Sequence, residues 1–135
     1  AAQIESPMFL AHVRATTGSA VQRTNCHPFA YGKWLFVHNG EITGFRRIKR
    51  ELVLAINPEL FPLIGGSTDS ELMFFLALSY GLEEDPFRAL EEMAAVVERI
   101  GREAGMPWIK RKRSGSVRTT KRWAPAGMDT PVGKV

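Results

Sequence analysis

The stretch Val37–Ile42, VHNGEI, carries the residues of this sequence best suited to chemistry, because an apolar segment runs straight into His-Asn-Gly. The side-chain amide of Asn39 and the backbone N–H of Gly40 are two donors that could face a carbonyl and stabilise an oxyanion during acyl transfer. Glycine would leave its N–H unobstructed. Asn-Gly is also common in turns, since both residues tolerate positive φ, so the motif alone leaves both interpretations open.

Two charged residues elsewhere in the chain could hold the two ends of a free amino acid. Arg14 offers a planar fork that matches a carboxylate, and Asp69 offers a counter-charge for an ammonium. Taken singly, each also has a structural interpretation, as a paired strand arginine or as a favourable charge at a helix start. Taken with Asn39 and Gly40, they lead to the prediction that all four residues converge around one small zwitterion.

Two apolar segments are predicted to be strands. Met8–Thr16 reads as a buried strand that carries His12 and Arg14 on the same face, because alternate residues of a strand share a face. Tyr31–Gly40, YGKWLFVHNG, is predicted as a second strand that ends at the His-Asn-Gly motif. The polar segment between them contains the sequence NCHPF and is predicted to be a loop.

From Phe45 onward the spacing of apolar residues becomes helical. The first helix is predicted to end at the Asn-Pro pair of residues 57–58, because the residue before proline disfavours helix. Its apolar face consists of Phe45, Ile48, Leu52 and Ile56. Thr68 and Glu71 have the spacing of a capping box, so a second helix is predicted from near Thr68 to near Gly81.

A third helix is predicted after residues 85–86, Asp-Pro, where the aspartate would be the N-cap and the proline the first helical residue. It should continue to about Gly105. Its predicted apolar stripe consists of Phe87, Leu90, Ala94, Val97 and Ile100 with Gly101.

Composition and charge divide the chain of 135 residues into two parts. Residues 107–135 carry eight Lys and Arg and one acid, whereas residues 1–106 have a net charge of −3. Residues 107–135 fit neither a helical nor a strand period, and we predict a disordered basic tail. No apolar run approaches the roughly 18 residues of a membrane span. The single cysteine, Cys26, cannot form an internal disulfide, which favours a reducing, cytoplasmic location.

Four short motifs, AHVRATTG, NCHPF, HNGEITG and STDSE, occur in this order, and together they resemble class II glutamine amidotransferase domains. The resemblance covers Phe9 to Gly105 and is strongest to small stand-alone members, a group that also includes γ-glutamyl amide hydrolases. Any one motif is weak, whereas four in order form a specific signal. The resemblance implies an α+β fold, as a partial four-layer α/β/β/α N-terminal nucleophile hydrolase sandwich over residues 1–106.

The same resemblance implies a role for each matched residue. Asn39 and Gly40 would form the oxyanion hole. Arg14 would bind the α-carboxylate of glutamine and Asp69 its α-ammonium. The residues implied to support the pocket wall are Thr16 and His27, with His12 beside them. The implied reaction is hydrolysis of the side-chain amide of glutamine or a γ-glutamyl amide through a cysteine thioester, on a small-molecule substrate and without a metal or a cofactor.

The chain departs from the family pattern at the nucleophile, which in the family is a cysteine at residue one. There the cysteine's own α-amino group serves as the base, because its pKa of about 7.7–8.0 lies close to neutrality. Residue one here is Ala1, and Cys26 has no free α-amine. We therefore expect an interior fragment of the domain that does not hydrolyse glutamine by the family mechanism as it stands. Whether the chain is itself an enzyme stays open.

Two other classes of function remain open. An intact clamp without a nucleophile is what a non-catalytic glutamine-binding or interaction domain would show. The basic segment with Trp108 and Trp123 could grip phosphates and stack on bases, but a solvated tail is the simpler interpretation, so we do not expect nucleic-acid binding. The abrupt change at Pro107 has three candidate origins, which are a shifted reading frame, an unspliced intron and a lineage-specific extension.

Overall fold

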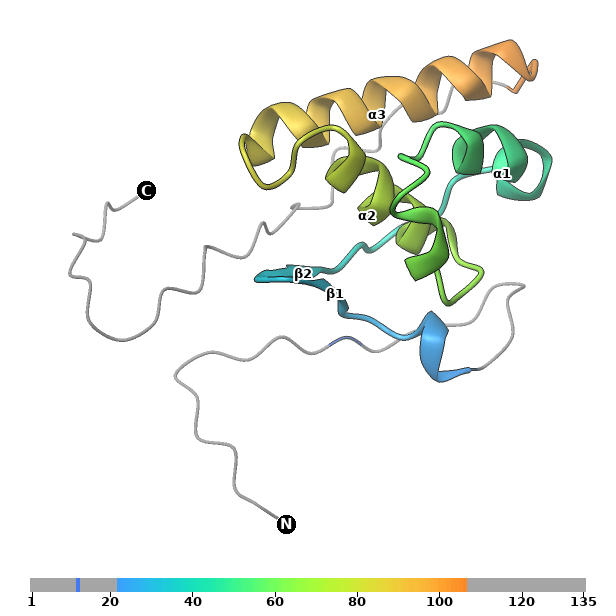
Figure 1. Cartoon of the computed structure of the whole chain (residues 1–135). Helices are drawn as coiled ribbons and strands as arrows, with labels where there is room; N and C mark the ends of the chain where they lie inside the picture. The colour runs from blue at the N-terminus through green and yellow to red at the C-terminus, as the bar shows by residue number, and fades with distance from the viewer. Residues whose placement is uncertain (1–11, 13–21, 107–135) are drawn as a thin grey trace, which may run out of the picture.

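The computed structural model of the chain describes His12 and residues 22–106 (Figure 1). The predicted strand Met8–Thr16, with Arg14 and Thr16, lies outside the described residues apart from His12. The predicted basic tail, residues 107–135, lies outside them as well.

A short β-hairpin and three α-helices make up most of the described part. In chain order the elements are the 3-10 helix η1 (Arg23–Asn25), strands β1 (Phe29–Tyr31) and β2 (Trp34–Phe36), helix α1 (Phe45–Leu54), the 3-10 helix η2 (Phe61–Leu63), and helices α2 (Asp69–Ser79) and α3 (Pro86–Glu103). Helices and strands thus occur together, as the α+β class requires. Within residues 22–106, no helix is long and apolar enough to cross a membrane.

The prediction of one strand over Tyr31–Gly40 is wrong, because the chain reverses inside it. Gly32 has a φ of +53°, and the turn at Gly32-Lys33 separates β1 from β2. The two strands pair antiparallel, with Tyr31 opposite Trp34 and Phe29 opposite Phe36. An apolar run with a single internal glycine looks like one strand until the positive φ is known. Since β2 ends at Phe36, the His-Asn-Gly motif belongs to the loop that follows.

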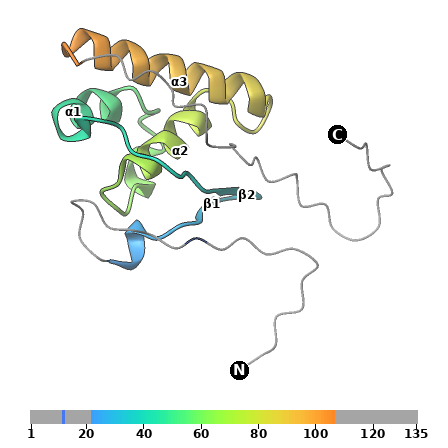
Figure 2. The ribbon, with the colours of Figure 1, turned by 180° about the vertical axis from the view of Figure 1, so that it is seen from behind.

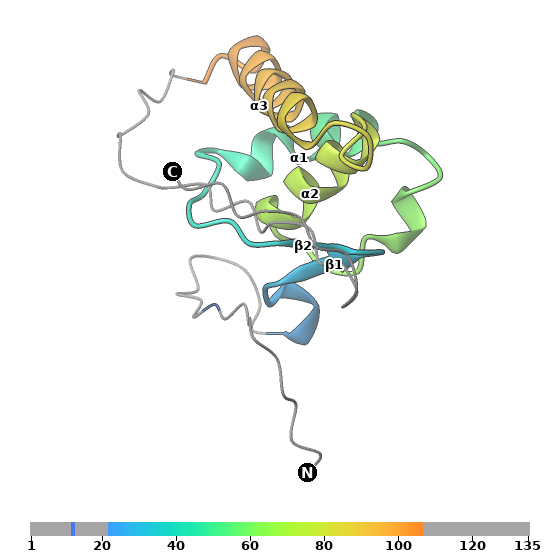
Figure 3. The ribbon, with the colours of Figure 1, turned by 90° about the vertical axis from the view of Figure 1, so that its left-hand side faces the viewer.

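Helix α2 lies between the hairpin on one side and α1 and α3 on the other (Figures 1 and 3). A helix covered on several sides is expected to be apolar all round, and beyond its polar first turn this one is apolar from Leu72 to Leu78. Its buried residues are Ser70, Glu71, Leu72, Phe74, Phe75, Leu76 and Ala77. Phe74 stacks on Phe36 of β2, with ring centroids 5.4 Å apart. The centre of the core is therefore α2, and both flanking layers are positioned against it.

Helix α1 confirms the first helical prediction. It begins at Phe45, after Gly44 at a φ of +68°, and Ile48 and Leu52 are fully buried on its inner face. It ends at Leu54, just before the Asn-Pro pair of residues 57–58. The backbone N–H of Asn57 donates to Ser79 Oγ at 2.9 Å, which joins the end of α1 to the end of α2.

Helix α3 begins where the sequence predicts, and its buried face overlaps the predicted stripe only in part. Asp85 is the N-cap, its Oδ1 accepting from Arg88 N at 3.2 Å, and Pro86 is the first helical residue. The predicted stripe is wrong at Phe87, which is 75% exposed, and confirmed at Ile100 and Gly101, which are buried. The buried residues are Ala89, Met93, Val96, Ile100 and Gly101. Two adjoining apolar stripes exist on this helix, and its packing across α1 and α2 selects between them (Figure 2).

Candidate functional site

The start of α2 is fixed by Thr68, which caps the helix as predicted. Its Oγ1 accepts from the backbone N–H of Glu71 at 3.2 Å. The Glu71 carboxylate, however, binds the preceding glycine turn instead of completing a capping box. It accepts from the N–H groups of Gly65 and Gly66, each at 2.9 Å. Glu71 is only 4% exposed, so these bonds fix the chain just before the helix.

Asn25, at the end of η1, joins the N-terminal part of the described chain to the same region. Its side chain is fully buried, and its Oδ1 accepts from Ser67 N at 2.8 Å. Its Nδ2 also donates to Ser67 Oγ at 3.3 Å. The asparagine of the NCHPF motif is thus a structural link between η1 and the start of α2.

Gly66 lies where no side chain fits, which gives a testable prediction. A Cβ at this position would lie 2.6 Å from the Thr24 carbonyl oxygen and 2.7 Å from Glu71 Oε2. Because a backbone atom must move to relieve this overlap, Gly66→Ala should lower the free energy of unfolding of the full chain by about 1–3 kcal/mol, measured by urea denaturation. Gly65→Ala is the matched control, since its Cβ would contact only Thr24 Cγ2 at 3.8 Å. Equal stabilities of the two variants would refute this packing.

The segment His38–Ile42, named here the 38–42 loop, is held at both ends by the first turn of α2. Asp69 Oδ2 accepts from the backbone N–H of Ile42 at 2.7 Å. At the other end, His38 Nδ1 and Ser70 Oγ are 3.0 Å apart and form a hydrogen bond. The middle of the loop, with Asn39 and Gly40, is exposed to solvent. The two candidate donors therefore lie between two anchors on consecutive residues of α2.

Asp69 has an anchoring role that sequence reasoning did not anticipate. Besides Ile42, its carboxylate accepts from the backbone N–H of Ser70 at 2.8 Å through Oδ1. An ionised carboxylate offers about four acceptor positions, so these two backbone bonds do not exhaust it. Asp69 is only partly buried. It can therefore anchor the 38–42 loop and still offer a negative charge to an ammonium group.

The imidazole of His38 lies directly against Gly40. A Cβ on Gly40 would be 3.0 Å from His38 Nε2 and 3.2 Å from Cε1, so any other residue here would push the His38 ring away by a few tenths of an ångström. Burial lowers the pKa of His38 from its ordinary value, an effect that the charge of Asp69 opposes and that His12 reinforces. Because the shift is downward from an ordinary pKa of about 6.5, the neutral form of the His38 imidazole predominates at pH 7.

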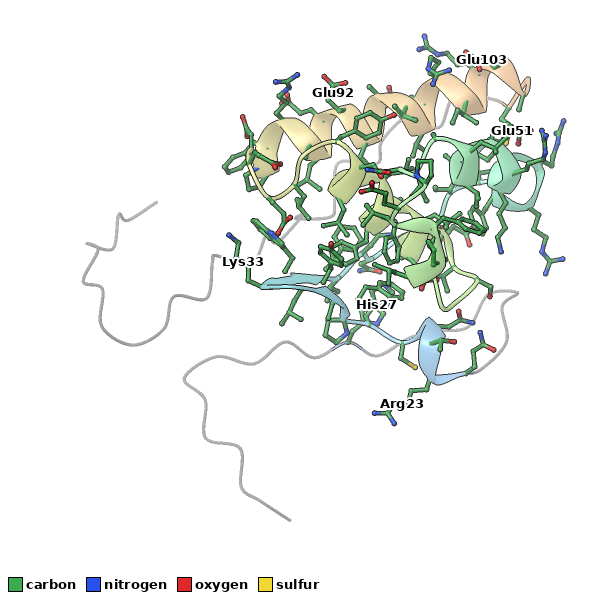
Figure 4. All side chains as sticks on the ribbon, viewed as in Figure 1. Arg23, His27, Lys33, Glu51, Glu92 and Glu103 are labelled. Atoms are coloured by element: carbon green, nitrogen blue, oxygen red, sulfur yellow. The ribbon has the colours of Figure 1, made fainter. Side chains whose placement is uncertain are left out.

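The other two histidines lie near this site. The rings of His12 and His27 have centroids 4.2 Å apart, and His27 meets the ring of Phe29 edge-on at 4.7 Å. In Figure 4, His27 lies between η1 and the lower end of α2. Among His12 and residues 22–106, no group of three or more histidine, cysteine or acidic side chains is placed to hold a metal ion.

The structure brings together part of the predicted set of site residues. Asn39 and Gly40 lie in the 38–42 loop, whose two ends are bonded to Asp69 and Ser70 at the start of α2. Arg14 and Thr16 lie outside the described residues, and the roles predicted for all of the site residues, His27 included, stay predictions. Sequence reasoning missed His38 and Ser70, although each stands next to a predicted residue, in HNG and TDS respectively.

Comparison with known proteins points to one family. The chain matches the family described as "Glutamine amidotransferases class-II" over residues 1–106. It is 47% identical over 78 residues to "Probable glutamine amidotransferase DUG3" of Saccharomyces cerevisiae. It is also similar to a solved structure of a glutamine aminotransferase class-II domain protein from Silicibacter pomeroyi, with a TM-score of 0.57 and 45% sequence identity.

These relatives are much longer than the matched segment. The match to the yeast protein covers 58% of this chain and 22% of that protein. The match to the Silicibacter structure covers 61% of this chain and 38% of the other chain. The chain thus spans less than half the length of the relatives it matches.

Proposed function

Because the chain belongs to the class II glutamine amidotransferases, we propose that the complete protein hydrolyses the side-chain amide of glutamine or of a γ-glutamyl amide. The observation that carries this proposal is the bond between Asp69 Oδ2 and Ile42 N, which joins a carboxylate to the loop with the two candidate donors. A substrate with an ammonium and an amide carbonyl on one short chain suits that pairing. The substrate is therefore a small amino acid or its amide derivative.

Each residue of the site has a distinct part in the proposed reaction. Asp69 binds the α-ammonium of the substrate, and Arg14 binds its α-carboxylate. Asn39 and Gly40 donate hydrogen bonds to the oxygen of the γ-carbonyl. When a thiolate attacks that carbonyl carbon, the oxygen becomes negatively charged, and two fixed donors stabilise it far better than mobile water does. His27 and Thr16 complete the pocket wall.

The chemistry proceeds in two steps. A cysteine thiol adds to the γ-carbonyl carbon as its proton passes to the cysteine's own α-amino group. That ammonium then protonates the leaving nitrogen, so the tetrahedral intermediate expels ammonia and leaves a γ-glutamyl thioester. Water then cleaves the thioester and releases glutamate and the free thiol. We assign the nucleophile to an N-terminal cysteine of the complete protein. Cys26 follows η1 and directs its thiol to the carbonyl oxygen of Gln22, at 3.5 Å, rather than to the 38–42 loop.

The layered arrangement supports a finer proposal about the fold. Helix α2 packs directly on the hairpin through Phe74 and Phe36. We propose that these are adjoining layers of the four-layer α/β/β/α sandwich of N-terminal nucleophile hydrolases.

The proposed function is tested with the full-length protein encoded by the gene and L-glutamine as substrate. Release of glutamate and ammonia in equal amounts is the expected result, with L-asparagine as the control because its shorter side chain would hold the carbonyl away from Asn39 and Gly40. Binding of glutamine by calorimetry without hydrolysis would replace the proposal with a glutamine-binding domain. Absence of both binding and hydrolysis would overturn it.

A further inference from the structure

His38 is held on two sides, although the proposed reaction gives it no role. On one side its Nδ1 forms the bond to Ser70 Oγ. On the other side its Nε2 and Cε1 lie 3.0 and 3.2 Å from the position that a Cβ on Gly40 would take. The ring therefore fills the space between the first turn of α2 and the peptide that carries the Gly40 donor. Because the ring contacts both, the position of α2 determines the position of this part of the 38–42 loop.

Ser70 is well suited to be the fixed end of this contact. It is only 4% exposed and lies on α2, the helix at the centre of the core. Its backbone N–H donates to Asp69 Oδ1 at 2.8 Å, and its hydroxyl lies 3.4 Å from the same oxygen. Its position is thus set by the helix and by the Asp69 carboxylate together.

Two arrangements of hydrogens satisfy the bond between His38 and Ser70. With its proton on Nδ1, neutral His38 donates to Ser70 Oγ, and the Ser70 hydroxyl donates to Asp69 Oδ1. With its proton on Nε2, His38 accepts from the Ser70 hydroxyl at Nδ1. The first chain of bonds ends on a carboxylate, which favours it. The orientation of the ring is therefore fixed by the hydroxyl of Ser70.

We propose that His38 and Ser70 form a positioning pair that holds the peptide between Asn39 and Gly40 in the orientation needed to stabilise the oxyanion. This role rests on the proposed function, because it concerns the donors assigned there. Neither residue contacts the substrate. Asp69 anchors the opposite end of the 38–42 loop, but it is also assigned to the substrate ammonium. Ser70 also bonds Asp69 through its backbone N–H, which a side-chain substitution leaves in place, so changes at His38 and Ser70 report mainly on the position of the donors.

The first test uses backbone NMR of this chain of 135 residues and needs no activity. The Gly40 amide is expected to be rigid, with an order parameter near 0.85, and Ser70→Ala should lower it to about 0.6 or below. Ser79→Ala is the matched control. It removes the same hydroxyl from the other end of α2, where Ser79 Oγ bonds Asn57 N and Phe75 O. The control should leave the Gly40 amide unchanged.

The second test measures glutamine hydrolysis by the full-length protein. Ser70→Ala is expected to lower kcat by about tenfold to 10²-fold, because a displacement of about 1 Å of a positioned group has an effect of that size. KM should change by no more than about twofold, since the shorter bond to Asp69, from the backbone N–H of Ser70 at 2.8 Å, survives the substitution. His38→Ala should have a similar effect, and Ser70→Ala should have no further effect in the His38→Ala background, because the two residues act as one unit.

Every outcome decides the inference. An unchanged Gly40 order parameter in Ser70→Ala overturns the inference. An unchanged kcat of Ser70→Ala in an active enzyme also overturns it. So does a double variant whose loss of kcat equals the product of the losses in Ser70→Ala and His38→Ala. The two proposals can also fail separately. If Ser70→Ala loosens Gly40 but the full-length protein neither binds nor hydrolyses glutamine, His38 and Ser70 do position the 38–42 loop, and the proposed function is wrong.

Discussion

Replacing Asn39 by alanine is expected to lower the kcat of the full-length protein for glutamine by about 10²–10³-fold. The side-chain amide is one of the two donors proposed for the oxyanion, and its contribution is largest in the transition state. A loss confined to the transition state lowers kcat and kcat/KM equally, so KM should stay nearly constant. Steady-state measurement of glutamate release over a range of glutamine concentrations separates the two constants.

The structure provides two controls for this prediction. Asn39 is exposed, and the anchors of its loop at Ser70 and Asp69 are untouched by the substitution, so the free energy of unfolding should change by less than about 0.5 kcal/mol. Asn57→Ala makes the same change at another exposed position, where the side chain only accepts from Glu59 N at 3.0 Å. Activity of Asn39→Ala equal to that of Asn57→Ala would remove Asn39 from the oxyanion hole.

Replacing Phe74 by alanine is expected to lower the free energy of unfolding by about 3–5 kcal/mol. Phe74 is 1% exposed, stacks on Phe36 of the hairpin and lies 5.9 Å from the ring of Phe75. The substitution removes the aromatic contact between α2 and the hairpin and leaves a cavity. Because small domains have a total stability of about 5–15 kcal/mol, this loss is a large fraction of the whole. Urea denaturation followed by circular dichroism measures it.

Phe87→Ala is the matched control for the core substitution. Phe87 is 75% exposed on α3, so the same loss of an aromatic ring should change the stability by less than about 0.5 kcal/mol. If both variants lost the same stability, the assignment of α2 as the centre of the core would be incorrect. The comparison also tests which face of α3 is buried, because the sequence pattern places Phe87 on the apolar stripe and the structure places it outside the core.

Several features of this protein were decided by the sequence alone. The starts of α2 and α3 follow from Thr68 and from residues 85–86, because an N-cap bonds a backbone N–H three residues ahead and needs no tertiary contact. The helical spacing from Phe45 likewise specifies α1. The four motifs in order were enough to indicate the family, and Asn39, Gly40 and Asp69 could be selected as candidates from the chemistry of their side chains.

Tertiary structure alone decided how these parts meet. The bond between Ile42 and Asp69 joins residues 27 positions apart, and the bond between His38 and Ser70 joins residues 32 apart. Local propensity carries no information about such pairs, so neither the second role of Asp69 nor the support of Gly40 by His38 could be read from the chain. The buried stripe of α3 was undetermined for the same reason. A residue's type sets what it can bind, whereas its partner depends on which distant segment the packing of the core brings within reach.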